Sequence, residues 1–294
     1  MSQRIGEKLN TIHSDSLILR TSRRTITIGE RTLIMGILNV TPDSFSDGGR
    51  FIAPETAMEA GMRMIEEGAD MIDIGGESTR PGSDPVSLED ELRRVIPVVR
   101  GLAKRSDIPL SVDTTKAGVA REALAEGVEI VNDISSLEHD GGMAKVVADA
   151  GAAVILMHMR GTPKTMQTGD LTYGSLRAEV ITYLRARIES AREAGIDPEQ
   201  ILVDPGLGFG KTAMDNVRLI KHLGELNVLG RPIVTGASRK SFIGYVTGGT
   251  PQERLEGTAA AVTAAILNGS RVIRVHDVAA MKKVAAMADA LNRA

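Results

Sequence analysis

The chain has no cysteine and no tryptophan among its 294 residues, and its aromatic content is only 2%. The absence of cysteine excludes disulfide bonds, thiolate nucleophiles and metal sites with cysteine ligands. The shortage of aromatic side chains argues against the stacking platforms with which proteins bind single-stranded nucleic acid. The formal net charge of −3 gives no sign of a polyanionic partner. We therefore expect no nucleic acid among the ligands.

Long apolar runs are also absent. No stretch of 18 or more apolar residues occurs, which predicts that no helix crosses a membrane. The first ten residues, MSQRIGEKLN, lack the apolar core of a secretory signal peptide. These two features predict a cytoplasmic protein without a membrane anchor.

What the chain does contain is a series of eight short apolar runs, each of which stops at a polar or charged cluster. Segments of helical pattern separate most of them, and strands that alternate with helices predict a parallel sheet buried on both faces. Eight such units predict an α/β fold, a (β/α)8 TIM barrel, in which the carboxyl ends of the strands form the rim that carries the active site. The clusters are Asn39; Gly75, Gly76 and Glu77; Asp113; Asn132 and Asp133; His158; Asp204; Ser238, Arg239 and Lys240; and Arg274 and His276.

The domain organisation follows from the length. The chain is somewhat longer than a barrel of about 250 residues, and no linker or low-complexity tract divides it. Residues 33–294 are therefore assigned to the barrel and residues 1–32 to an N-terminal extension packed on it. Within the extension, 17–19 and 25–28 alternate in polarity around a polar turn, which predicts a β-hairpin. We expect this hairpin to plug the amino-terminal end of the barrel.

Three helices can be placed from local signals. Ser87 and Asp90 resemble a capping box at the start of a helix over 88–104. Alternating Arg and Glu over 176–194 predict a solvated outer helix. The segment 257–268 is small or apolar on every side, so it is buried on more than its barrel face. Either close packing between helices or a subunit interface explains this, and we favour a homodimer through this helix.

The acids at the predicted rim have two interpretations. Asp113, Asp133 or Ser135 can each cap a following helix, whereas Asp204 has no adjacent helix to cap. Because Asp113, Asn132 and Asp204 all follow strands, we also consider a ligand that needs several acceptors. A carboxylate accepts two parallel hydrogen bonds from a planar ring with an edge of N–H donors. A guanine-like or pterin ring has such an edge.

Cationic and phosphate-binding features complete the pattern. Lys240, Arg274 and His276 follow the last two predicted strands, where TIM barrels often bind phosphate, although solvated surface charge is the plain alternative. The segment 206–212 looks like a P-loop but lacks the first glycine of that motif, since Pro205 occupies its position. The sequence thus predicts a planar-ring pocket beside a polyphosphate pocket.

Five segments together resemble the motifs of the dihydropteroate synthase family, in the same order along a barrel. The resemblance covers the chain from Leu33 onward, and the first two segments are long enough to be specific. The segments are Asn39–Gly49, Gly75–Gly82, Asp204–Lys211, Ser238–Ser241 and Arg274–His276.

The resemblance implies an enzyme of folate synthesis and the target class of the sulfonamides. It joins 6-hydroxymethyl-7,8-dihydropterin diphosphate to 4-aminobenzoate and releases 7,8-dihydropteroate and diphosphate. It further implies Mg²⁺ at Asn39, with Asp47 as a weaker ligand candidate. The pterin is then expected to be held by Asp113, Asn132, Asp204 and Lys240, with Met157 packed against its ring and Phe209 nearby. The diphosphate is expected to contact Thr79, Arg274 and His276. The aminobenzoate is expected to be surrounded by Phe45, Arg80, Pro81 and Ser238. The catalytic set is Lys240, Asp113, Arg274 and His276.

The residue types agree with this chemistry. An aromatic amine is already nucleophilic near pH 7, so stabilisation of the departing diphosphate is the demanding part, and the rim carries cations but no Ser-His-Asp constellation. We expect the Asp-, Ser- and Gly-rich loop 40–51 to close over the substrates, with Phe45 as its apolar contact.

Two other functions remain open at this point. A methyltetrahydrofolate-dependent corrinoid methyltransferase has a similar pterin barrel but no diphosphate to hold. A regulatory barrel without turnover is expected to have lost part of the first loop or the last cations.

Overall fold

The computed structural model describes residues 16–41 and 54–294. Its main sheet has eight parallel strands in the order β8-β7-β6-β5-β4-β3-β10-β9, and a parallel bridge between Val203 and Ile233 joins its two edges. The expected TIM barrel is confirmed. Its strands are β3 (Leu33–Asn39), β4 (Met71–Gly75), β5 (Leu110–Asp113), β6 (Ile130–Asp133), β7 (Ala153–Met157), β8 (Ile201–Asp204), β9 (Val234–Thr235) and β10 (Val272–Val275).

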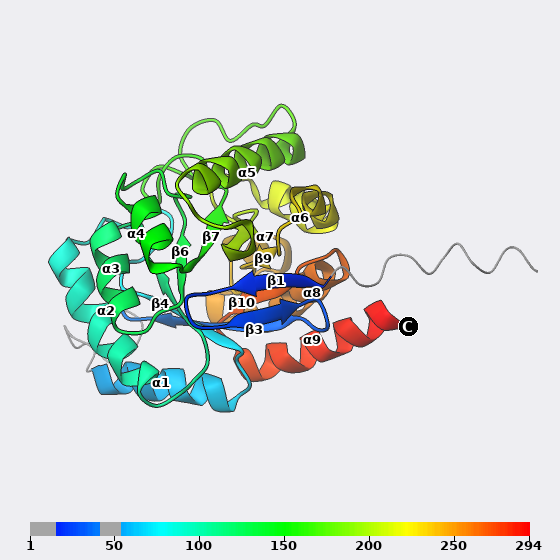
Figure 1. The fold of residues 1–294 in the computed structure, drawn as a ribbon. Helices are drawn as coiled ribbons and strands as arrows, with labels where there is room; N and C mark the ends of the chain where they lie inside the picture. The colour runs from blue at the N-terminus through cyan, green and yellow to red at the C-terminus, as the bar shows by residue number, and fades with distance from the viewer. Residues whose placement is uncertain (1–15, 42–53) are drawn as a thin grey trace, which may run out of the picture.

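Helices surround the strands as a ring (Figure 1). Their apolar faces bury against the strands, in one large core cluster, because the strands of a parallel barrel present apolar side chains outward as well as inward. The helices are α1 (Pro54–Glu66), α2 (Leu88–Ala103), α3 (Ala117–Ala125), α4 (Met143–Ala150), α5 (Leu176–Glu193), α6 (Ala213–Lys221), α7 (Ser241–Thr247), α8 (Leu255–Leu267) and α9 (Val278–Arg293), with short 3₁₀ turns at Pro198–Gln200, Leu223–Leu229 and Pro251–Glu253.

The expected hairpin is present before the barrel. β1 (Leu17–Arg20) and β2 (Thr25–Ile28) pair antiparallel. Leu19 and Ile28 are completely buried in a cluster with side chains from the inner face of the barrel, among them Met35 and Leu202. In Figure 1 the hairpin lies over the strands and inside the ring of helices. It therefore closes one end of the barrel with apolar side chains.

Local signals placed the helix ends to within one or two residues. Ser87 caps α2 by accepting a hydrogen bond from the backbone N of Asp90 at 3.1 Å. The second bond of the motif differs from the expected one, because the Ser87 hydroxyl donates to the Asp90 carboxylate instead. The short helix α7, which follows Lys240, was not expected from the sequence; its seven residues are too few for a helical period to stand out. Among the described residues, no helix has the length and apolarity that a membrane span requires.

Candidate active site

The register of the sheet brings the expected acceptors side by side. Asn39 pairs with Gly75, Gly75 with Asp113, and Asp113 with Asn132, across four neighbouring strands. On the other side of the barrel, Met157 pairs with Asp204. The carboxyl ends of these strands thus meet at one rim, and Asp113, Asn132 and Asp204 are all buried there.

Arg274, on β10, links these groups. Its Nε donates to Asp73 Oδ2 at 2.5 Å and its Nη2 to Asp113 Oδ2 at 2.5 Å. Asn132 donates to the same Asp73 oxygen at 2.9 Å. The other three of the five N–H groups of the guanidinium have no hydrogen-bond partner among the described residues. Arg274 therefore serves as the counter-charge of the buried acids and also as a possible anion ligand.

Asp73 is a site residue that the sequence reading missed. It lies inside β4, is completely buried, and its Oδ1 has no hydrogen-bond partner among the described residues. The sequence does contain a signal for Asp73, which is a carboxylate within the apolar run MIDIG. A charge in a strand that is buried on both faces requires a partner, so such a residue indicates a polar contact inside the barrel.

Burial and the neighbouring charges act in opposite directions on this cluster. Burial raises the pKa of Asp113, Arg274 opposes that rise, and Asp73 adds to it. For Arg274, burial alone would lower the pKa, but Asp73 and Asp113 outweigh burial and raise it. The guanidinium therefore keeps its charge inside the barrel.

Asp204, at the end of β8, and Lys240, just before α7, are further expected site residues. Asp204 Oδ1 accepts a hydrogen bond from the backbone N of Gly206 at 2.7 Å, and burial raises its pKa. The ammonium of Lys240 donates to the Leu207 carbonyl and lies 4.1 Å from the centre of the Phe209 ring. Burial lowers the pKa of Lys240 to about 8. Phe209 belongs to a small apolar cluster with Ile134, Met157 and Met166.

The capping alternative can now be judged for each acid. Asp113 bonds Arg274, and the bond to the backbone N of Lys116 comes from Thr114 instead. Asp133 accepts from the backbone N of Ser135 and of Leu137, so it holds the turn after β6. Asp204 bonds its own loop. Of the three acids, only Asp113 bonds a residue from a distant part of the chain, whereas the hydrogen bonds of Asp133 and Asp204 stay within their own loops.

Ser238 and His276 form a pair beside Arg274. The Ser238 hydroxyl lies 3.0 Å from His276 Nδ1 and accepts from the backbone N of His276 at 3.2 Å. Burial, with Arg274 and Arg239 nearby, lowers the pKa of His276 to about 3. His276 is thus neutral at pH 7, and not one of the cations that the sequence reading counted. Arg239 pairs with Asp277 and does not join the site.

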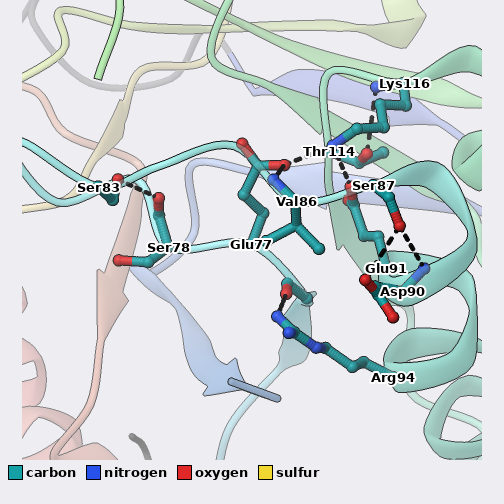
Figure 2. A network of polar contacts seen from close by, with 11 residues as sticks. Glu77, Ser78, Ser83, Val86, Ser87, Asp90, Glu91, Arg94, Thr114 and Lys116 are labelled. Atoms are coloured by element: carbon teal, nitrogen blue, oxygen red, sulfur yellow. Dashed lines mark hydrogen bonds and ion pairs between the residues drawn. The ribbon is translucent and has the colours of Figure 1, made fainter. Parts of the chain in front are cut away.

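The loop after β4 carries Thr79, Arg80 and Pro81, and Arg80 and Pro81 are exposed. Its base is held by polar contacts that Figure 2 shows. Glu77 accepts from Lys116, which also pairs with the buried Glu91. Thr79 and Asp113 line a common cavity of 420 Å³ that extends toward the loops after β6 and β7. Of the acid cluster, only Asp113 is among the residues that line this cavity.

The metal assignment has less support from the described residues. Asn39 lies at the end of β3, where its amide oxygen faces Gly75. Phe45 and Asp47 lie outside the described residues. Residues 16–41 and 54–294 contain no group of three or more His, Asp or Glu side chains arranged to hold a metal ion. Of the two proposed metal ligands, Asn39 and Asp47, only Asn39 lies among the described residues.

Comparisons with known proteins identify the family to which the chain belongs. The profile of the family described as pterin binding enzyme matches residues 35–276. A dihydropteroate synthase from Synechocystis is 50% identical over 90% of this chain and 92% of its own length. The chain belongs to the pterin-binding enzyme family.

Solved structures narrow the group. A Yersinia pestis dihydropteroate synthase, solved with a sulfonamide drug, superposes with a TM-score of 0.90 at 42% identity and covers 95% of this chain and 100% of its own. The Xanthomonas albilineans enzyme, solved with 4-aminobenzoic acid, has a TM-score of 0.88 at 45% identity. The match covers 95% of this chain and 99% of the Xanthomonas chain. Within the family, the chain groups with the dihydropteroate synthases, which are transferases of folate synthesis.

Proposed function

We propose that the chain condenses 6-hydroxymethyl-7,8-dihydropterin diphosphate with 4-aminobenzoate. The amine nitrogen attacks the methylene carbon, the bond from that carbon to the diphosphate oxygen breaks, and the amine loses a proton. The products are 7,8-dihydropteroate and diphosphate. The observation that carries this proposal is the assembly of Asp73, Asp113 and Asn132 around Arg274. It supports the proposal because carboxylates and an amide suited to a ring with N–H donors lie beside a guanidinium suited to an anion.

In this proposal the pterin ring lies between the acid cluster and Asp204. The second oxygen of Asp204 and the oxygens of Asp113 accept from the ring N–H groups, and Asn132 adds an amide. Lys240, held over Phe209, donates to the ring, and Met157 packs against it. Burial of these acceptors makes an unpaired group costly, so the pocket selects a ring whose donors match it.

The diphosphate lies at the carboxyl end of β10 in this proposal. The free donors of Arg274 and the neutral ring of His276 bind its oxygens and stabilise the charge that develops as it leaves, with Thr79 at the edge of the group. Arg80, Pro81 and Ser238 surround the aminobenzoate, together with Phe45.

Mg²⁺ belongs to the proposal as well. Mg²⁺ prefers oxygen ligands, keeps several waters and often takes few protein ligands beside phosphate oxygens, so a single amide oxygen at Asn39, with Asp47 as a further candidate, fits its donor preference. When bound, the ion supplies charge stabilisation to the leaving diphosphate.

The proposed assembly is a homodimer through the helix around 257–268, in a cytoplasmic protein. The supporting observation is the exposure of Leu267 on α8 and of Met287 and Leu291 on the neighbouring α9, which are 45%, 61% and 52% exposed. Apolar side chains on adjacent elements often mark an interface.

The test is an assay of diphosphate release with and without 4-aminobenzoate, coupled to detection of dihydropteroate. We expect both products in equal amounts, and only when both substrates are present. Methyl transfer from methyltetrahydrofolate without diphosphate chemistry would favour the corrinoid alternative. Pterin binding without turnover would favour a regulatory barrel.

A further inference from the structure

Lys211 is a buried lysine that the proposed reaction does not use. It is 2% exposed and lies just after the loop 205–210 that follows β8. Its ammonium contacts the carbonyl oxygens of Gly206 at 2.9 Å, Phe209 at 3.0 Å and His158 at 3.2 Å. It also lies 2.9 Å from His158 Nδ1. No carboxylate forms an ion pair with it in the part of the chain that the structure describes.

The loop around this ammonium has a backbone that only glycine accommodates. Gly206 and Gly210 have φ values of +68° and +64°. A Cβ on Gly206 would lie 1.9 Å from the His158 carbonyl oxygen, and one on Gly210 would lie 2.6 Å from that of Arg160. The loop after β8 is therefore pressed onto the chain that follows β7. Three carbonyls converge in the space between the two segments. That of Gly206 also accepts from the backbone N of Phe209 at 3.1 Å, whereas those of Phe209 and His158 require Lys211 as their donor.

The neighbouring imidazole determines the direction of the hydrogen bond. Burial, and then the charge of Lys211, lowers the pKa of His158 to about 3, so its ring is neutral. The charged form of Lys211, whose pKa burial lowers to about 7, has no lone pair and can only donate, so Nδ1 of the neutral ring accepts from it. The ring packs edge-on against Tyr183, with 5.1 Å between ring centres, which limits its movement. The ammonium thus joins two loops through four acceptors, in the manner of a bound cation.

We propose that Lys211 is a positioning residue for the pterin pocket, holding the loop after β8 on the segment after β7. The inference rests on the proposed function. Lys211 binds the carbonyls of Gly206 and Phe209. Between these two residues lies Leu207, whose carbonyl accepts a hydrogen bond from Lys240. The ring of Phe209 also lies against the Lys240 ammonium. Asp204, one residue before the loop, bonds the N of Gly206. A shift of the loop therefore moves the ring-facing groups on this side of the pocket.

The test compares Lys211→Met, His158→Leu and His158→Asn with the wild-type protein. Calorimetry with the dihydropterin diphosphate measures binding, and thermal unfolding measures stability. Met keeps the length of Lys but leaves the carbonyls of Phe209 and His158 without the donor that Lys211 supplies, so we expect a loss of pterin affinity of about tenfold or more. His158→Leu removes one acceptor and should show a smaller loss. His158→Asn keeps an acceptor as many bonds from the backbone as Nδ1, and should restore affinity.

Two controls separate positioning from stability. Lys221→Met removes an exposed lysine on α6, and Ile188→Ala lowers stability on α5, away from the pocket. The inference would be overturned if Lys211→Met bound the pterin with wild-type affinity. It would also be overturned if Lys211→Met and Ile188→Ala had the same melting temperature and lost the same amount of pterin affinity. If Lys211→Met does not fold, the comparison of His158→Leu with His158→Asn tests the inference. Equal pterin affinity of these two variants would also overturn the inference. A wild-type protein that binds no dihydropterin would instead refute the proposed function.

Discussion

At the scale of single residues, Arg274 holds together charges that the barrel could not otherwise bury. It is the only ion-pair partner of Asp73 and of Asp113 among the described residues. Both acids are almost completely inaccessible to water. Removing one partner of a buried ion pair costs much more than the pair itself contributes, because the other charge stays buried. Arg274 therefore has a structural role that is separate from diphosphate binding.

This separation predicts the effect of Arg274→Met. We expect the free energy of unfolding at pH 7 to fall by about 3–5 kcal/mol in urea denaturation, since two carboxylates lose their counter-charge. Adding Asp73→Asn should recover part of this loss, because an amide needs no counter-ion. Arg93→Met, which removes an exposed arginine on α2, is the control. A loss below about 1 kcal/mol would mean that water replaces the guanidinium.

Asp204→Asn tests the pterin contact directly. The substitution turns one carboxylate oxygen into a donor that faces the ring N–H groups, so affinity for the pterin diphosphate should fall by about 10- to 100-fold in calorimetry. Asp149→Asn, on the exposed side of α4, should bind like the wild type. Unchanged affinity would assign Asp204 to its bond with Gly206 alone.

The pH profile reports the charge of Lys240. Burial lowers the pKa of this lysine to about 8, so it is charged at pH 7 and loses its proton as the pH rises to 9. Its proposed contact with the pterin ring needs the charged form, and kcat/KM for the pterin substrate should fall with a midpoint near that pKa. Lys240→Arg keeps its charge throughout this range, so this step should disappear from its profile. If the fall in kcat/KM occurs at the same pH in the wild type and in Lys240→Arg, it belongs to the titration of another group, such as Lys211.

At the scale of elements, the hairpin and the rim occupy opposite ends of the barrel. Leu19 and Ile28 close the amino-terminal end, and a buried contact from Thr21 to Glu129, at 2.6 Å, ties the turn to the residue that precedes β6. Because the apolar contacts of the hairpin lie at one end of the barrel and the candidate site lies at the other, stability and chemistry depend on different residues. The division of the chain at residue 32 remains a prediction.

Ile28→Ala should therefore lower stability without changing the reaction. Removing a completely buried Ile side chain costs about 2–5 kcal/mol in unfolding free energy. KM for both substrates, and kcat per folded molecule, should stay at wild-type values. Ile18→Ala, at a position 43% exposed on the same hairpin, is the matched control. A change in KM would mean that the floor affects the rim.

At the scale of the whole molecule, the outer helices differ in polarity. α5 carries ion pairs such as Arg187–Glu138 and Arg192–Glu189, whereas α8 has Thr263 and Ala264 only partly covered and Leu267 exposed. A solvated helix and an apolar one on the same barrel suggest different neighbours. The interface of the proposed homodimer is assigned to the apolar side for this reason.

Leu267→Glu tests this assignment by sedimentation velocity over a range of concentrations. We expect the wild-type protein to sediment as a dimer and the variant as a monomer, because a buried carboxylate without a partner opposes association. Leu88→Glu, at a position 38% exposed on α2, should leave the dimer intact. A wild-type monomer at all concentrations would refute the proposed interface.

Periodicity and local signals were sufficient to predict the barrel, the hairpin and the helix cap at Ser87. These features depend on residues close together in the chain: apolar runs of strand length, and Ser87 three positions before Asp90. The same reading placed Asp113, Asn132 and Asp204 at strand ends, since the end of an apolar run is visible in the sequence. The family motifs then provided a role for each position.

What the sequence could not decide was which distant residues are partners. Asp73 and Arg274 are 201 positions apart, and only the closure of the barrel brings β10 beside β3 and within reach of β4. The neutrality of His276 depends on burial, and the four acceptors around Lys211 exist only because two loops meet. The chain order therefore determined the elements and their polar ends, while hydrogen-bond partners and protonation states were decided by tertiary burial, which removes water and leaves each charge dependent on its neighbours.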